Sequence, residues 1–219
     1  MSRRCTFTTR NLIHRLFALA LIFGLLPLFG LVAVALVLQA AWRGESPKIV
    51  FFEWRVSSGR PFRLYKFRVL MEGELKQYFT RHPMDSVRLL EREGSKLTPI
   101  GKIVRATHLD YLPELINVMR GDINLVGPRP YAVAELEAFP HRRIEARRVL
   151  RAGVIGPHQA ATGPAFGGDA SAQADTAYFL RIKDATLPCM LREDLEIFSN
   201  ALRTGCRQVG RTLIQRASR

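Results

Sequence analysis

One carboxylate and one guanidinium in residues 101–130 could together do phosphate chemistry. Asp110 lies just before a short amphipathic segment in which Pro113 suits the first helical position and Gly121 suits the residue past the helix end. The unpaired N–H groups and the dipole at a helix N-terminus favour an ionised carboxylate and can also bind a phosphate. Arg129 follows in a Gly-Pro-Arg-Pro turn, which can hold its guanidinium for a two-pronged hydrogen bond to phosphate. The alternative for Asp110 is a capping role worth about 1 kcal/mol.

Lys66 and Arg68 are a second candidate phosphate site. Residues 44–71 predict a β-hairpin whose two strands flank a turn at residues 57–59. Side chains two positions apart in a strand point to the same face, so both cations could hold phosphates together. A solvated strand face is the alternative. The aromatic side chains of the first strand could lie at a lipid interface: Phe51, Phe52 and Trp54.

The remaining segments carry weaker signals. Residues 72–98 are charged without a clear period and predict a variable surface loop with one short helix near residues 86–93. Residues 131–150 predict a helix whose basic face could bind lipid headgroups or a nucleotide diphosphate, although a solvated face explains the pattern as well. Small and polar residues 160–174 predict a mobile loop.

An apolar run from about Leu16 to Leu38 follows a basic start. The run of about 23 residues is long enough, at about 1.5 Å per residue, to cross a bilayer core of roughly 30 Å. Basic residues flank it on both sides, so the positive-inside rule gives no orientation. Pro27 near its middle removes one N–H donor and predicts a kink. A helix that enters the membrane, breaks at Pro27 and returns to the same face explains both features; a kinked spanning helix and a signal peptide are the alternatives.

Composition narrows the class of protein without fixing its function. A chain of 219 residues with 47% hydrophobic content predicts one membrane-associated domain. The net charge of +14 implies an anionic partner, which can be nucleic acid, anionic lipid or a nucleotide-containing substrate. No nucleic-acid recognition motif accompanies the charge, which disfavours the first of these. The three cysteines, Cys5, Cys189 and Cys206, are widely spaced and indicate a reducing compartment.

Residues 101–130 resemble the signature of the bacterial sugar transferase family, the monotopic phosphoglycosyl transferases. The positions that match the family pattern are Arg105, Thr107, Leu109, Asp110, Leu112, Pro113, Leu115, Asn117, Val118, Gly121, Asp122, Leu125, Val126, Gly127, Pro128, Arg129 and Pro130. Further similar stretches lie around residues 59–71, 151–163, 175–178 and 192–204. The resemblance therefore covers about residues 16–205.

The resemblance implies a fold and an activity. The fold would be α+β and monotopic, with a re-entrant membrane helix in residues 1–43, a small, mostly helical catalytic domain with a short hairpin in residues 44–205, and a basic tail in residues 206–219. The activity would be transfer of a sugar-1-phosphate from a nucleotide diphosphate sugar, such as a UDP-sugar, to polyprenyl (undecaprenyl) phosphate. It would need Mg²⁺ and would take place at the cytoplasmic face of the bacterial inner membrane, as the first membrane step of polysaccharide synthesis. A homo-oligomer is left open.

The resemblance also assigns roles to residues. Asp110 would be the nucleophile and a candidate metal ligand. Four cations would neutralise the phosphate oxygens: Lys66, Arg68, Arg105 and Arg129. Asp175, in the family's D-x-x-Y pattern, would also belong to the substrate-binding residues.

The chain departs from the family pattern at the catalytic dyad, where Tyr111 replaces the usual glutamate. A phenol, with a reference pKa of about 10, is a poor substitute for a carboxylate at neutral pH. We expect His108 or Glu114 to compensate. At the membrane segment, Leu26 precedes Pro27 where the family usually has serine. The competing hypothesis is a degenerate homologue that binds lipid phosphate or nucleotide sugar as a pathway scaffold without transferring the sugar.

Overall fold

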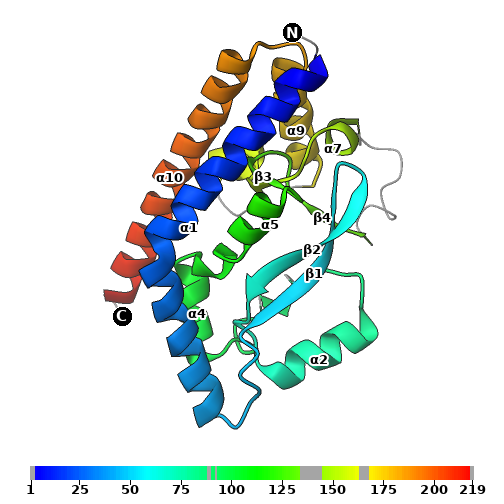
Figure 1. Cartoon of the computed structure of the whole chain (residues 1–219). Coiled ribbons are helices and arrows are strands. Elements are labelled where there is room, and N and C mark those ends of the chain that lie inside the picture. The colour runs from blue at the N-terminus through cyan, green and yellow to red at the C-terminus, as the bar shows by residue number, and fades with distance from the viewer. Residues whose placement is uncertain (1–2, 88–89, 92, 134–144, 163–167, 218–219) are drawn as a thin grey trace.

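The computed structural model describes residues 3–87, 90–91, 93–133, 145–162 and 168–217. It is a mostly helical α+β fold with small sheets and one long, apolar N-terminal helix. That helix, α1 (Arg3–Trp42), is the one helix of the described chain that is long and apolar enough to cross a membrane. Figure 1 shows α1 beside the C-terminal helix α10 (Leu187–Ala217), both running in the same direction from the same end of the molecule.

The predicted break at Pro27 is a bend. The structure has one continuous helix with Pro27 inside it, and the ribbon changes direction about halfway along (Figure 1). Proline removes one donor and crowds the preceding turn, which bends a helix without ending it where the neighbouring turns remain bonded. The expected helix-break-helix is therefore wrong for the backbone, because α1 continues through Pro27.

The predicted hairpin is confirmed. Strands β1 (Val50–Ser57) and β2 (Arg60–Phe67) pair antiparallel in a register that places Glu53 opposite Leu64. Ser58 and Gly59 form the two-residue turn with φ of 49° and 72°, the left-handed conformation that tight hairpins need. A short strand, β4 (Tyr131–Ala132), pairs with β1 to give the order β2-β1-β4.

The segment around Asp110 also follows the sequence closely. Helix α4 (Pro99–Ala106) begins at Pro99 after Thr98, whose hydroxyl accepts a hydrogen bond from the N–H of Gly101 at 3.0 Å. Asp110 lies in a short 3₁₀ helix, η1 (Leu109–Tyr111), which leads into α5 (Glu114–Arg120). Gly121 ends α5 at φ 81°, as a left-handed C-terminal residue should.

A second, parallel pair of strands follows, formed by β3 (Asn124–Val126) and β5 (Gly153–Ile155). Two segments were predicted less well, residues 72–98 and residues 160–174. Helix α2 (Glu72–Arg81) occupies part of the predicted surface loop, because Leu75 packs into the core. Helices α8 (Pro157–Thr162) and α9 (Gly168–Ile182) occupy most of the predicted mobile loop.

The predicted helix at 131–150 is only partly confirmed. It begins as β4 and ends as α7 (Glu145–Val149), and residues 134–144 lie outside the described part of the chain. At the C-terminal end, α10 runs without interruption past residue 205, where the sequence predicts the basic tail to begin.

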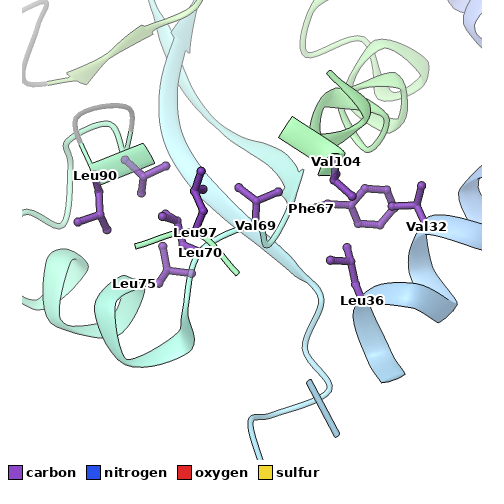
Figure 2. Packing of buried hydrophobic residues seen from close by; sticks show 10 residues of the cluster. Val32, Leu36, Phe67, Val69, Leu70, Leu75, Leu90, Leu97 and Val104 are labelled. Carbon is purple, nitrogen blue, oxygen red and sulfur yellow. The ribbon is translucent and has the colours of Figure 1, made fainter. Parts of the chain in front are cut away.

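Three apolar clusters hold the body together, and α1 contributes to each. Val32 and Leu36 pack with Phe67, Val69 and Val104, as Figure 2 shows. Farther toward the N-terminus, Ala18 is fully buried in a second cluster with α5, and Phe7 packs against a third cluster built from β3, α9 and α10. The N-terminal helix is thus attached along its length to the same body that carries Asp110.

Candidate active site

The inner face of the hairpin is charged, which is unusual for a buried surface. Glu53 and Arg55 alternate on β1, and Lys66 faces them from β2; all three are buried. Glu53 accepts Lys66 Nζ at 2.9 Å on one carboxylate oxygen and Arg55 Nη2 at 2.5 Å on the other. Burial acts to raise the pKa of Glu53, but the two cations outweigh it and lower that pKa to about 2. Buried ion pairs are costly unless each group is paired, so this network indicates a functional site.

Asp110 is the carboxyl group that this network leaves unsatisfied. It is 1% exposed, and its Oδ1 has no hydrogen-bond partner among the described residues. Burial raises its pKa to about 7, against the opposing charge of Lys66 and with a contribution from Glu91. The expected stabilisation of the ionised form by the helix end is therefore outweighed by burial.

Glu114, the first residue of α5, is a second buried acid beside Lys66. It is 3% exposed, and burial raises its pKa to about 8, with Lys66 opposing and Asp110 adding to the shift. Glu114 and Lys66 line a narrow pocket of about 20 Å³ together with Tyr111 and Arg129, which leaves room for about one water molecule. The Lys66 ammonium also lies 5.2 Å from the centre of the Tyr111 ring.

His108 lies on the outer side of η1. It has a left-handed backbone with φ 58°, its side chain is exposed, and its ring lies 6.1 Å from that of Tyr111. Of the two residues expected to compensate for the missing dyad glutamate, the structure thus brings Glu114 into the buried pocket and leaves His108 at the surface.

Arg105 joins the site from α4. Its Nη2 lies 3.8 Å from a carboxylate oxygen of Glu91, which is 3% exposed, and its charge acts to lower the pKa of Asp110. The Arg105 side chain is partly exposed, so it can reach a ligand while it remains close to Asp110.

Arg129 connects the pocket with a second group of polar residues. It also lines a small neighbouring pocket with Tyr131 and Arg147. The Arg147 guanidinium stacks 3.7 Å from the centre of the Tyr131 ring, and Asp175 accepts its Nη2 and Nε at 2.8 and 3.0 Å. Asp175 is buried and does not itself line this pocket. It acts on the pocket through the Arg147 guanidinium, to which it is hydrogen-bonded.

The structure does not bring Arg68 to Lys66. The Arg68 guanidinium pairs with Glu45 at 2.7 Å and donates to the carbonyls of Ser46 and Lys48 at 2.9 and 3.0 Å. These contacts attach the loop after α1 to the residue after β2. Arg68 therefore positions α1 relative to the hairpin, while Lys66 lies in the candidate site.

Comparison with known proteins agrees with the motif. The family model described as bacterial sugar transferase matches residues 6–204. The chain belongs to this family. It is 38% identical over 122 residues to the galactosyl transferase CpsE of Streptococcus agalactiae, a match that covers 54% of this chain and 26% of the relative.

Two further relatives carry names with both substrates in them. One is a UDP-glucose:undecaprenyl-phosphate glucose-1-phosphate transferase of Caulobacter vibrioides, 35% identical over 134 residues, 59% of this chain and 45% of the relative. The other is a UDP-N-acetylgalactosamine-undecaprenyl-phosphate N-acetylgalactosaminephosphotransferase of Aeromonas hydrophila, 30% identical over 148 residues, 66% of this chain and 33% of the relative. The matches thus span less than half the length of each of these three proteins.

The site of this bacterial sugar transferase contains buried charged residues that the sequence did not predict. Glu53 and Arg55 are the clearest examples, because they alternate on β1 and form its buried face. Their i, i+2 spacing is a sequence signal for one face of a strand, but the aromatic residues that alternate with them give a stronger signal for the other face. Phe52 and Trp54 lie on the opposite face, where Arg63 stacks 4.9 and 5.3 Å from their ring centres. Glu91 carried no spacing signal at all.

Magnesium, which the family implies, fits the residues in a limited way. Within the described ranges no group of three or more His, Cys, Asp or Glu side chains is arranged to hold a metal ion. Mg²⁺ nevertheless is often held by one or two carboxylates together with substrate phosphates and water. Asp110 Oδ1 and Glu91 Oε1 are buried oxygens without a hydrogen-bond partner, which is the donor chemistry that such a site needs.

Proposed function

We propose that this chain transfers a sugar-1-phosphate from a nucleotide diphosphate sugar of the UDP-sugar class to polyprenyl phosphate, in the first membrane step of polysaccharide synthesis. The observation that carries the proposal is the buried Asp110 carboxyl, which has an unpartnered oxygen and lies in the electrostatic field of Lys66 and Arg105. Family membership and the substrates named for the two relatives support the same activity.

The reaction takes place in two displacements at phosphorus. An Asp110 carboxylate oxygen attacks the β-phosphorus, and the bond from that phosphorus to the bridging oxygen breaks, which releases the nucleoside monophosphate. A phosphate oxygen of the lipid acceptor then attacks the aspartyl phosphosugar, frees the carboxylate and forms the lipid diphosphosugar. Lys66, Arg105 and Arg129 offset the charge on the phosphate oxygens, and Arg147, held by Asp175, adds a cation on the far side of Arg129. Mg²⁺, when bound, would polarise the phosphate oxygens.

Glu114 supplies the carboxyl group that Tyr111 lacks. A pKa of about 7 leaves Asp110 protonated part of the time at neutral pH, and a protonated carboxyl is a poor nucleophile. Burial raises the pKa of Glu114 to about 8, against the charge of Lys66, so when Asp110 and Glu114 share one proton near neutral pH, Glu114 is the group that holds it and Asp110 is the ionised one. Glu114 keeps this proton while Asp110 attacks and carries the phosphosugar. His108 remains a weaker candidate for this role because its side chain is exposed.

The test of the activity measures the intermediate directly. Membranes that contain the protein are incubated with a panel of UDP-sugars and labelled polyprenyl phosphate, and release of nucleoside monophosphate is followed. Intact-mass and peptide mass spectrometry should find one phosphosugar on Asp110 when the acceptor is withheld. The proposal fails if no donor gives this adduct and Asp110→Asn leaves product formation unchanged.

A scaffold that binds without transferring is the competing function, and Tyr111 in the dyad position favours it. The assay for release of nucleoside monophosphate distinguishes a scaffold from an enzyme. A scaffold retains nucleotide sugar or lipid phosphate but releases no nucleoside monophosphate at any donor concentration.

The contacts of α1 support a protein that occupies one leaflet at the cytoplasmic face. Near its start, Arg10 pairs with Asp194 of α10 at 2.7 Å, and near its end Val32 and Leu36 pack on the body. A helix bound to one body at both ends cannot place those ends on opposite sides of a bilayer. Large apolar side chains along its length are exposed and would lie in the lipid: Leu12, Leu16, Phe17, Leu19, Phe23, Leu26, Leu31, Val34, Val37 and Leu38.

Two native thiols test this arrangement without any substitution. Cys5 near the start of α1 and Cys189 in α10 are both free and exposed. A membrane-impermeant maleimide should label neither in intact spheroplasts and both after permeabilisation, as read from their peptides. Labelling of Cys5 alone in intact spheroplasts would demonstrate a spanning helix.

A further inference from the structure

A cavity of about 800 Å³ lies at the turn end of the hairpin. Its walls come from the start of α1, the hairpin turn at Ser58, α7 and α9, which Figure 1 shows gathered at the end of the molecule where the chain begins. Ligand-binding cavities usually measure about 300–1,000 Å³, so this space is large enough for a bound small molecule. Lys66 lies six residues after Arg60 on β2, about 20 Å along the strand at about 3.3 Å per residue, which separates Lys66 from this cavity.

Two guanidinium groups without an anionic partner lie at or beside the cavity. Arg151 lines it, and Arg15 follows the lining residue Asn11 by one turn of α1. In the described part of the chain, one guanidinium nitrogen of each arginine is buried without a hydrogen-bond partner. Burial lowers the pKa of Arg151, and the charge of Arg15 adds to this effect while Asp122 opposes it. Two neighbouring cations that repel each other in this way indicate a missing anionic ligand.

The other charged side chains leave the cavity positive. Lys183, just after α9, also lines it and forms no ion pair with any residue that the structure describes. Arg10 lines it as well but is engaged by Asp194 at 2.7 Å. Glu145 is the one acid among the described lining residues, and it is exposed to solvent, which screens its charge. The cavity therefore favours an anion.

Apolar side chains form another part of the lining. Val149 and Leu180 are each 55% exposed, and Phe179 lines the same space. On α1 the lining residue Asn11 is followed by Leu12, which is 53% exposed and is the first of the large apolar side chains that would lie in the lipid. The cavity thus combines cations with apolar surface at the point where α1 would enter the membrane. A ligand that fits both features is an anionic amphiphile.

We propose that this cavity binds the headgroup of an anionic phospholipid, with Arg151 and Lys183 at its phosphate. Val149 and Leu180 pack against an acyl chain, and Arg15 adds to the positive field. A phospholipid held here fixes the start of α1 at the level of the headgroups. The polyprenyl phosphate acceptor is also an anionic amphiphile, but its phosphate has to reach the region of Lys66, about 20 Å away along β2. Binding of the phospholipid does not depend on sugar transfer.

Native mass spectrometry tests the site by counting the lipids that stay bound to the full-length protein released from nanodiscs of phosphatidylcholine and phosphatidylglycerol. The wild type should retain one phosphatidylglycerol in preference to phosphatidylcholine. Arg151→Gln should reduce the retained fraction by at least about fivefold, because it removes a cation from the phosphate. The matched control is Arg192→Gln, which removes an exposed arginine of α10 with the same change of charge and should retain the lipid as the wild type does.

A second variant tests the apolar wall. Leu180→Glu places a negative charge in the cavity and should also expel phosphatidylglycerol. Its control is Leu202→Glu, since Leu202 is a leucine of α10 with the same exposure of 55% and does not line the cavity. If Arg151→Gln does not fold, by circular dichroism, Leu180→Glu decides the question, because an exposed side chain can be replaced with little effect on folding.

Inorganic phosphate and polyprenyl phosphate are the competitors, and neither should displace phosphatidylglycerol at equal concentration. Displacement by inorganic phosphate would indicate a site for free phosphate, and displacement by polyprenyl phosphate would indicate an acceptor site; either result overturns the phospholipid assignment. Equal retention of phosphatidylcholine, or full retention of phosphatidylglycerol by folded Arg151→Gln, overturns it as well. Retained phosphatidylglycerol in a protein that never forms the aspartyl adduct would leave the lipid site standing and remove the transferase.

Discussion

Glu114→Gln should stabilise the protein at alkaline pH while it reduces turnover. The pKa of Glu114 rises from an ordinary 4.5 to about 8 in the folded state. Between these values the folded chain keeps a proton that the unfolded chain has released, so this group's contribution to stability is complete below pH 4.5 and is lost as the pH rises to about 8. At about 1.4 kcal/mol per pH unit, the loss has an upper bound of about 5 kcal/mol. Glutamine has nearly the shape of the protonated acid and carries no such dependence.

The assay compares Tm by circular dichroism at pH 5, 6, 7 and 8 for the wild type, Glu114→Gln and the exposed control Glu93→Gln. The first two should agree near pH 5 and separate as the pH rises. Even about 2 kcal/mol at pH 8 would raise the Tm of Glu114→Gln by about 4–8 °C over the wild type. Turnover of the same variant should fall, most strongly below about pH 7, because glutamine cannot take up the proton that otherwise stays on Asp110, whose pKa is about 7. Parallel Tm curves for Glu114→Gln and the wild type, or full turnover in the variant, would refute the assignment.

Three further predictions follow from the same geometry. Tyr111→Glu restores the family's acidic pair and should keep or raise turnover in the sugar-phosphate release assay; a large loss in a folded protein would contradict this. Asp175→Asn should raise KM for the nucleotide sugar by about tenfold with a smaller effect on kcat, since it weakens the hold on Arg147; adding Asp175→Asn to Arg147→Ala should then cost little more, and additive losses would argue against a positioning role. Gly153→Ala should lower stability by about 3 kcal/mol, because a Cβ there would lie 2.2 Å from the backbone nitrogen that follows β3; Gly73→Ala, in open space inside α2, should be neutral or slightly stabilising in a thermal unfolding assay.

The sequence predicted the parts of the fold that depend on local signals. The turn at Ser58 and Gly59 and the end of α5 at Gly121 each follow from the conformation that those residues prefer, whereas α4, which starts at Pro99, was not predicted. Helix α2 was missed because charged residues interrupt its apolar pattern, although Leu75 is buried in the first cluster and Tyr78 and Phe79 pack against it. Such a helix is stabilised by long-range packing, which single-chain patterns do not report.

The sequence predicted candidate site residues only where the family motif and the local chemistry pointed to the same residue, as they do at Asp110 and Arg129. Glu91 was invisible because a lone glutamate in a charged segment resembles a surface residue, and only the fold shows that it is buried beside Arg105. Arg68 was wrongly predicted to lie in the site beside Lys66. The two residues are spaced to share one strand face, but the Arg68 guanidinium binds three partners in the loop after α1.

The contacts of Arg10 join α1 to the elements that carry the proposed active site. Its guanidinium pairs with Asp194 and also donates to the carbonyl of Val126 at 3.0 Å. Val126 is the last residue of β3, and the rigid turn that carries Arg129 begins at the next position. Under the proposed function, the depth of α1 in the lipid would therefore set, through one guanidinium and three residues of chain, the position of Arg129, a proposed phosphate-binding cation. The proposed lipid acceptor and water-soluble donor would have to meet at Asp110, and a helix bound rigidly to the site would let one small chain bring the lipid phosphate to the correct height.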